Sequence, residues 1–248
     1  MPDKDHIPWN RDKEVGAKPP LTLNQVQTIR NLLTASGDLR EQLMFELAID
    51  TSFRGSDIVR LQVSHFVRGH EITDTIKLRP QKTKARTKKK GTNTGVAVGI
   101  LKPETVELLQ EYLEKTGKSG DDYLFTPLRG KQNPHITPHG YRGIVKRWFT
   151  RAEINTEVYA SHSLRRVNPT LIYANTGNLK AVQELLGHTS IENTAKYLGV
   201  GQAEAIDTAR KYRAQSPVFL LRTRSINSCC SVLFSCLDSC RSVLNVSI

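Results

Sequence analysis

The 248-residue sequence lacks any long uncharged run of apolar residues, and Met1 to Pro20 contain no apolar stretch. The first absence excludes a membrane-spanning helix, which needs about twenty consecutive apolar residues. From the second we expect no secretory signal peptide. All four cysteines fall within residues 229–240, whereas a disulfide framework would distribute them through the fold. We therefore expect free thiols, no membrane association and a reducing cytoplasm.

Patterns typical of metal sites are also missing. The spacing of the four cysteines fits no familiar zinc site, and no histidine lies close to them in the sequence. No cluster of carboxylates suits a pair of magnesium ions, which disfavours a metal-dependent nuclease. We expect neither a metal nor an organic cofactor.

Acidic residues are outnumbered, with 24 Asp and Glu against 36 Lys and Arg, for a formal net charge of +12. Such an excess favours a polyanionic partner, unless the charge merely keeps the protein soluble. The segment 77–90 holds eight basic residues and no acidic one, between two predicted strands. We interpret it as a basic hairpin that reaches a phosphate backbone, the alternative being a solvated charged face. Its basic residues are Lys77, Arg79, Lys82, Lys84, Arg86, Lys88, Lys89 and Lys90.

Composition divides the chain into three parts. Residues 1–20 form a lead-in rich in charge and proline, 21–213 a folded domain, and 214–248 a tail rich in serine and cysteine. The tail is either the product of a shifted reading frame or a helix that docks on a neighbouring subunit.

Apolar periodicity within residues 21–213 predicts mainly helices. The predicted helices begin after Thr22 and Asp38, at Ser56 (running to Leu61) and at Pro103, and recur through 137–213. Two strands, at 72–78 and 95–100, flank the basic segment. This combination predicts a mostly helical α+β fold with a small antiparallel sheet.

The chemically active residue types gather between positions 162 and 197. They are His162, Arg165, His188 and Tyr197, with Arg54 upstream. Arginine binds phosphate oxygens through two parallel contacts, histidine moves a proton near neutral pH, and a tyrosine hydroxyl can act as a covalent nucleophile. Each of these residues alone is commonly structural. Together they suit an attack on a phosphodiester that needs no metal.

The order Arg, His-x-x-Arg, Gly-His and Tyr resembles the tyrosine recombinases, or phage-type integrases, over roughly residues 20–213. The resemblance implies a tyrosine nucleophile that forms a 3′-phosphotyrosyl link to DNA, two arginines that bind the phosphate, and two histidines that move protons or donate to phosphate oxygens. The implied catalytic residues are Tyr197, Arg54, Arg165, His162 and His188. Arg166 is an alternative to Arg165 as the second phosphate-binding arginine, but only Arg165 satisfies the His-x-x-Arg spacing.

The resemblance also implies a general acid and an orienting carboxylate. Lys82 would protonate the leaving 5′ oxygen, with Lys84 as a close rival. Asp57, three residues beyond Arg54, occupies the family's acidic position and would orient the arginine or a histidine. The remaining basic residues of 77–90 would contact DNA.

Duplex DNA is the implied partner, bound by a homotetramer at synapsis, with accessory DNA-bending proteins as further partners. Such enzymes integrate, excise or invert mobile segments. Related enzymes usually carry an N-terminal helical domain that closes around DNA, whereas about twenty residues precede the first predicted helix here. A short form, a clamp supplied by a partner and weak DNA binding all fit this length. Asn168 and Pro169 predict a disturbed helix after the arginines.

Two other functions fit part of the pattern. Residues 179–198, LKAVQELLGHTSIENTAKYL, also resemble a helix-turn-helix, which would make the protein a non-enzymatic DNA-binding regulator or a decayed recombinase. A topoisomerase-like enzyme that nicks and reseals one strand shares nearly the same residue set. The match around LIYANTGNLKAVQELLGHT favours the recombinases.

Overall fold

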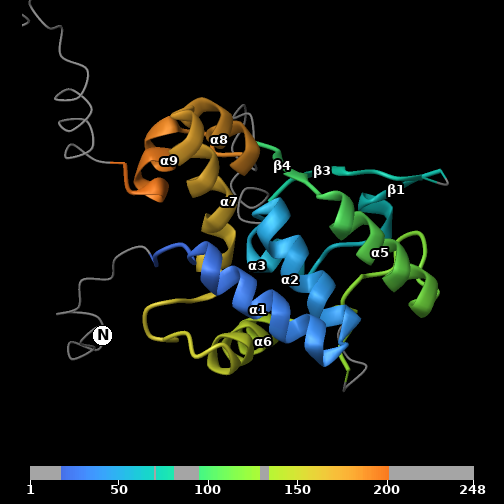
Figure 1. Cartoon of the computed structure of the whole chain (residues 1–248). Helices are drawn as coiled ribbons and strands as arrows, with labels where there is room; N and C mark the ends of the chain where they lie inside the picture. Colours follow the sequence, from blue (N-terminus) through green and yellow to red (C-terminus); the bar gives the residue numbers. More distant parts are fainter. Residues whose placement is uncertain (1–17, 70, 81–94, 129–133, 201–248) are drawn as a thin grey trace, which may run out of the picture. The chain divides into compact units, whose positions relative to one another are not determined.

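The computed structural model shows a mostly helical fold with two small antiparallel sheets (Figure 1). It describes residues 18–69, 71–80, 95–128 and 134–200. The fold class predicted from the sequence is confirmed. The lead-in before Lys18 and the tail 214–248 lie outside the described residues.

The first two helices begin where the sequence predicts. Thr22 caps α1 (Leu23–Ser36) through a reciprocal pair: the Gln25 backbone N–H donates to the Thr22 hydroxyl at 3.2 Å, and the Gln25 side chain accepts from the Thr22 N–H at 2.9 Å. Asp38 caps α2 (Leu39–Thr51) by accepting from the Glu41 N–H. Satisfying these first N–H groups fixes where each helix starts.

The predicted helix at Ser56 is shorter than expected. The helix α3 (Gly55–Ile58) is a single turn, after which the Arg60 and Leu61 N–H groups donate to carbonyls three residues back instead of four. The Leu61 carbonyl accepts from the Leu124 N–H at 2.9 Å. The 3-10 helix η1 (Val63–His65) follows.

The sheets are also smaller than predicted. The expected strand 72–78 is divided into β2 (Glu71–Ile72), which pairs with β1 (Val67–Arg68), and β3 (Thr75–Leu78). A turn at Thr73, whose hydroxyl accepts from the Thr75 N–H, separates the two. β3 pairs with β4 (Ala97–Ile100) in the register Thr75 to Ile100.

The remaining helices confirm the predicted helical region as far as residue 200, and residues 201–213 lie outside the described residues. These helices are α5 (Pro103–Thr116), α6 (Pro138–Arg151), α7 (Ser161–Thr176), α8 (Leu179–Leu186) and α9 (Ile191–Leu198). The cap of α9 is Ser190, whose hydroxyl accepts from the Glu192 N–H.

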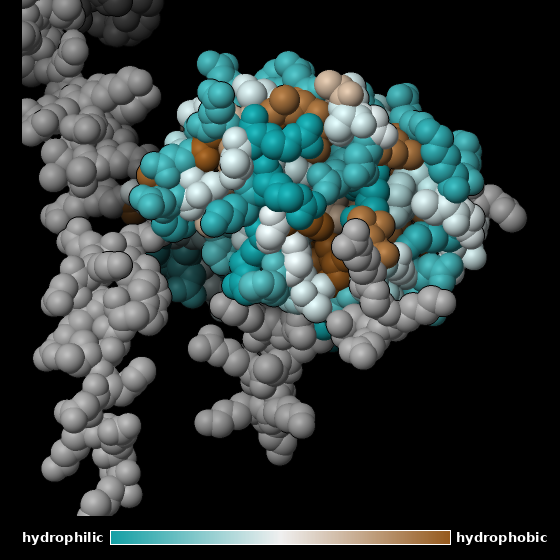
Figure 2. Space-filling view, turned by 90° about the horizontal axis from the view of Figure 1, so that it is seen from below, coloured by the Kyte–Doolittle hydropathy of each residue, from teal (hydrophilic) through white to brown (hydrophobic). Residues whose placement is uncertain are grey.

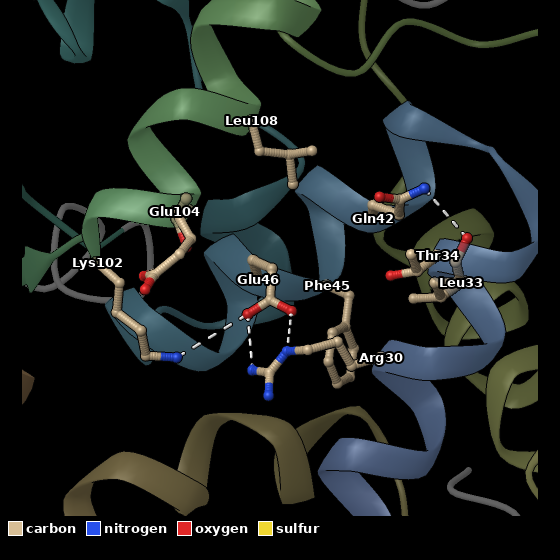
Figure 3. Close-up of a pocket in the computed structure, with 10 residues that line it drawn as sticks. Arg30, Leu33, Thr34, Gln42, Phe45, Glu46, Lys102, Glu104 and Leu108 are labelled. Atoms are coloured by element: carbon tan, nitrogen blue, oxygen red, sulfur yellow. Dashed lines mark hydrogen bonds and ion pairs between the residues drawn. The ribbon is translucent and has the colours of Figure 1, made fainter.

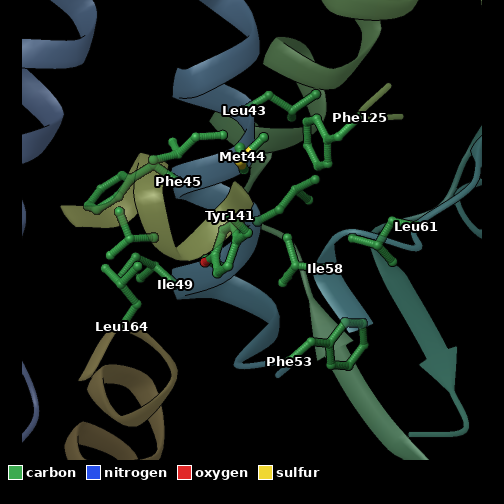
Figure 4. Close-up of a cluster of buried hydrophobic side chains, with 14 of the residues drawn as sticks. Leu43, Met44, Phe45, Ile49, Phe53, Ile58, Leu61, Phe125, Tyr141 and Leu164 are labelled. Carbon is green, nitrogen blue, oxygen red and sulfur yellow. The ribbon is translucent and has the colours of Figure 1, made fainter. Parts of the chain in front are cut away.

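The core places Arg54 through a close contact between α3 and α6. Tyr141 of α6 is buried with Ile58 and Leu164 (Figure 4). A Cβ atom on Gly55 would come within 2.8 Å of the Tyr141 ring, so only glycine fits there without displacement. This contact fixes the start of α3, and therefore the residue immediately before it, Arg54.

The Asn168–Pro169 pair does not interrupt α7, which continues through both residues. Proline has no N–H, so the Arg165 carbonyl loses its usual partner four residues along the helix. Asn168 Nδ2 donates to the Asp50 carbonyl at 3.4 Å, which fastens α7 to the end of α2.

A pocket of about 410 Å³ lies between α1, α2 and the start of α5 (Figure 3). Arg30 and Glu46 form a two-point ion pair across it at 2.6 and 2.9 Å, and Lys102 Nζ lies 3.0 Å from Asp50 Oδ1. None of the sequence-predicted site residues lines this pocket. Its ion pairs therefore brace the helices and do not form part of the predicted site.

Hydrophilic residues cover most of the face in Figure 2, and apolar residues occupy small separate areas. The larger exposed apolar side chains are scattered along the chain: Leu23, Val96, Ile100, Leu128, Val158 and Ile191. Within the described part of the chain, no helix combines the length and apolarity that crossing a membrane requires.

The turn between α8 and α9 rests directly on the backbone of β4. Gly187 ends α8 in the left-handed conformation, with φ 63°, and a Cβ atom there would lie 2.7 Å from the Ala97 nitrogen. A Cβ atom on Gly95 would lie 2.3 Å from the Gly187 carbonyl oxygen. Both positions therefore require glycine, and Gly187 requires it for its conformation as well.

The substitution Gly187→Ala should destabilise the fold more than Gly177→Ala. Gly177 ends α7 with the same φ of 63° but has nothing within 4 Å of an added Cβ atom. Its substitution should cost only the left-handed strain, about 1–2 kcal/mol. At Gly187 the displacement of β4 adds to that strain. Urea unfolding of both variants measures the difference, and equal losses would contradict the close contact.

Candidate active site

Four of the predicted catalytic residues come together from four places in the chain. Arg54 immediately precedes α3, and Arg165 lies in the second turn of α7. His188 occupies the turn between α8 and α9, and Tyr197 lies near the end of α9. The charge of Arg54 acts on the pKa values of the other three, which reflects their proximity.

Arg165 is buried, with 4% of its surface exposed, and its Nη2 has no hydrogen-bond partner. Burial lowers the pKa of Arg165, and Arg54 lowers it further, whereas Tyr197 and the buried Asp57 oppose the shift. A guanidinium group remains charged despite such shifts. A buried cation with an unused donor is costly, and an anion bound beside it would remove that cost.

Tyr197 lies against this cation. Its ring centroid is 5.7 Å from Arg165 Cζ, and its hydroxyl is buried without a hydrogen-bond partner. Burial raises the pKa of Tyr197, while Arg165, Arg166 and Arg54 oppose that rise. After burial, Arg165 has the largest effect on this pKa, through its charge and its nearness to the hydroxyl. The hydroxyl is therefore protonated at neutral pH and open to a ligand.

His188 is fixed by bonds to the helices on either side of it. Its N–H donates to the Gln183 carbonyl at 3.1 Å, and its own carbonyl accepts from Gln183 Nε2 at 3.0 Å. Its ring nitrogen Nδ1 lies 3.1 Å from Thr194 Oγ1, and its ring meets Tyr197 edge-on at 5.5 Å. Burial, followed by the charges of Arg165 and Arg54, lowers the pKa of His188 to about 4. The imidazole is therefore neutral at pH 7.

The other predicted site residues differ in how exposed their side chains are. His162 is exposed in the first turn of α7, whereas Arg165, three residues later, is buried. Asp57 and Arg79 line the same small hollow of about 90 Å³. Lys77 and Arg79 are exposed on and just after β3.

The rest of the predicted basic hairpin lies outside the described residues. This includes the predicted general acid and its rival as well as the other proposed DNA contacts: Lys82, Lys84, Arg86, Lys88, Lys89 and Lys90. Among the residues that are described, no three His, Cys, Asp or Glu side chains gather in a way that could hold a metal ion.

Two residues near the site were missed by the sequence analysis. The sequence indicates Arg166 only as an alternative to Arg165 at the phosphate. In the structure, Arg166 Cζ lies 5.2 Å from the Tyr197 ring centroid. Thr194 is fully buried and supports His188 through its hydroxyl. Thr194 could have been found, because it precedes Tyr197 by three residues and so lies on the same face of the predicted helix.

Comparison with known proteins gives one consistent group. The phage integrase family matches residues 20–204. A tyrosine recombinase XerC from Anoxybacillus flavithermus is 29% identical over 181 residues, which is 73% of this chain and 56% of that protein. The chain spans about half the length of the curated relatives it matches.

Solved structures share the fold. The XerA recombinase superimposes with a TM-score of 0.58 and 20% identity, covering 79% of this chain and 66% of that one. The Tn1549 transposon integrase in complex with circular intermediate DNA gives a TM-score of 0.60 and 17% identity, covering 82% and 69%. The predicted fold is thus that of known recombinases.

Acidification should destabilise the protein through His188. Its pKa is about 4 in the folded protein against 6.5 ordinarily, so between these values the unfolded chain binds a proton that the folded protein excludes. Stability should therefore fall as the pH falls through this window. His188→Gln should lose less stability than the wild type between pH 7 and about pH 4.5, as measured by urea unfolding. Thr194→Val keeps the histidine, so it should lose as much stability on acidification as the wild type does. Equal losses in His188→Gln and the wild type would contradict the shift.

Proposed function

Because this chain belongs to the phage integrase family, we propose that it is a site-specific DNA recombinase that cleaves and rejoins duplex DNA through a 3′-phosphotyrosyl bond. One observation carries the proposal: the Tyr197 hydroxyl and Arg165 Nη2 are both buried without hydrogen-bond partners. A scissile phosphate beside them would supply a reaction partner for the hydroxyl and an acceptor for the guanidinium group.

In the proposed reaction, the Tyr197 hydroxyl oxygen attacks the phosphorus atom and its proton passes to an acceptor. The bond from phosphorus to the 5′ oxygen breaks, and that oxygen leaves with a proton as a free hydroxyl. Arg54 and Arg165 stabilise the negative charge that develops on the non-bridging oxygens. One phosphoester replaces another, so the step can reverse and reseal the strand without nucleotide hydrolysis.

His188 would serve this step as a neutral imidazole. Thr194 Oγ1 lies 3.1 Å from its Nδ1 and 3.4 Å from the Ser190 carbonyl. When the threonine hydroxyl donates to that carbonyl, it accepts the Nδ1 proton and leaves Nε2 as an acceptor. When it donates to Nδ1 instead, Nε2 carries the proton and can donate to a phosphate oxygen.

The remaining roles are proposed from the family resemblance. His162, exposed at the start of α7, would move protons at the phosphate, and Asp57 would orient the arginines. Lys82, or its rival Lys84, would protonate the leaving 5′ oxygen. Lys77 and Arg79 would bind the DNA backbone together with the other basic residues of 77–90.

Duplex DNA is the proposed substrate, acted on in the cytoplasm. Two structural neighbours, the XerH recombinase and the Tn1549 integrase, are solved with DNA substrates, and the second belongs to a transposon. This supports a mobile element as the setting. We further propose a homotetramer at synapsis, with accessory DNA-bending proteins where the target requires them.

The position of Tyr197 disfavours the regulator alternative. A recognition helix would direct this side chain toward base edges. Its hydroxyl is instead buried, and its ring lies near Arg165 and Arg166 of α7. The orientation supports an enzymatic role over a purely binding one.

Tyr197→Phe should abolish covalent capture of DNA, because it removes the only atom proposed to bond to phosphorus. The assay incubates the protein with nicked suicide duplexes and detects adducts that survive denaturation. Tyr159→Phe is the matched control and should form adducts at the wild-type rate. Adducts that persist in Tyr197→Phe would overturn the assignment of the nucleophile.

DNA binding should weaken steeply as salt concentration rises, because phosphate contacts release counterions. Lys77→Ala and Arg79→Ala should each reduce the slope of log affinity against log salt by about 1. Lys115→Ala is the control, because Lys115 is already paired with Glu111 at 2.6 Å on α5. The slopes come from fluorescence anisotropy with a labelled duplex. An affinity that does not respond to salt would count against the proposed interface.

A further inference from the structure

Arg166 connects the proposed nucleophile to the segment that leads into α1. Its side chain is buried, with 7% of its surface exposed. Its Nη1 donates to the Lys18 carbonyl at 2.7 Å, and its Cζ lies 5.2 Å from the Tyr197 ring centroid. Three segments that are distant in sequence therefore meet at one guanidinium group.

We propose that Arg166 is a positioning residue for Tyr197, holding its ring from α7 while anchored to the backbone at Lys18. The inference rests on the proposed function for its catalytic consequence, but the contact itself does not depend on DNA. A cation over an aromatic ring is attracted to the negative face of the ring, and more strongly when both are shielded from water.

The anchor is itself held in place. Lys18 Nζ donates to the Glu157 carbonyl at 2.5 Å, so this residue is fastened by its side chain and by its carbonyl. Arg166 is thus fixed by a strong, charge-assisted hydrogen bond to the Lys18 carbonyl. A fixed cation can define where the ring lies, whereas a freely moving one would follow it.

Arg165 has a second proposed role, because it would also bind the scissile phosphate. The charged and titratable groups facing Tyr197 are Arg165 and Arg166 of α7, Arg54 before α3, and the neutral imidazole of His188 between α8 and α9. A bound phosphodiester would bring one negative charge beside Arg54 and Arg165 and so offset part of their effect on Tyr197. Arg166, bonded to a carbonyl, would remain the cation that favours the ionised tyrosine and holds its ring.

The first test measures the ionisation of Tyr197 without DNA. Ultraviolet difference titration of each protein against the same protein carrying Tyr197→Phe isolates this one hydroxyl. Arg166→Met should move its ionisation to higher pH, because the variant removes a cation that lowers the pKa of Tyr197. Arg142→Met removes a charge from an exposed position on α6 and should leave the titration unchanged. An unshifted titration in Arg166→Met would overturn the inference.

The second test measures the rate of adduct formation against pH. Arg166→Met should form adducts about fivefold more slowly at neutral pH, the effect of losing one partly shielded cation–ring contact. The rate should recover at alkaline pH, and DNA affinity should stay at the wild-type level, because Arg166 is not proposed to touch phosphate. A uniform loss at every pH would contradict positioning through Tyr197.

A third variant covers the case in which Arg166→Met does not fold. Arg166→Lys keeps the charge but loses the planar group that reaches the carbonyl and the ring together. It should give a smaller shift of the titration in the same direction, and no shift at all would overturn the inference. If the wild type forms no adduct, the proposed function fails, while the titration still decides whether Arg166 positions the tyrosine.

Discussion

The burial of two adjacent guanidinium groups is the constraint on which the site depends. Arg165 and Arg166 are 4% and 7% exposed, and each keeps one side-chain nitrogen without a hydrogen-bond partner. Removing a cation from water is expensive unless other groups compensate for the lost hydration. Here the ring of Tyr197, the Lys18 carbonyl and the buried Asp57 compensate in part. An anion bound beside these groups would remove the remaining cost.

The elements of the fold could be predicted wherever a local rule decides them. Thr22 and Asp38 satisfy free N–H groups within one turn, so the starts of α1 and α2 followed from the sequence. The end of α3 could not be predicted. The chain just after it pairs with a distant segment through the hydrogen bond between Leu61 and Leu124, and such partners leave no mark on local periodicity.

The site could be predicted in its residue types but not in its electrostatics. The spacing of His162 and Arg165 indicates a shared helix, yet their different exposure depends on what packs over α7. The depressed pKa of His188 arises from burial and from two arginines contributed by other segments. The contact of Arg166 with the tyrosine ring likewise requires α9 to fold back on α7. Each of these properties belongs to the tertiary structure.

The backbone contact between Gly187 and β4 affects how a displacement passes from one to the other. Main chain lies directly on main chain there, since a Cβ atom on Gly95 or Gly187 would collide with backbone atoms. Where side chains lie between two elements, they can change rotamer and so accommodate a small displacement. Where backbone lies directly against backbone, no side chain is present to adjust. A displacement of β4 would therefore move the backbone of Gly187 and of the next residue, His188, because no side chain at this contact can adjust first.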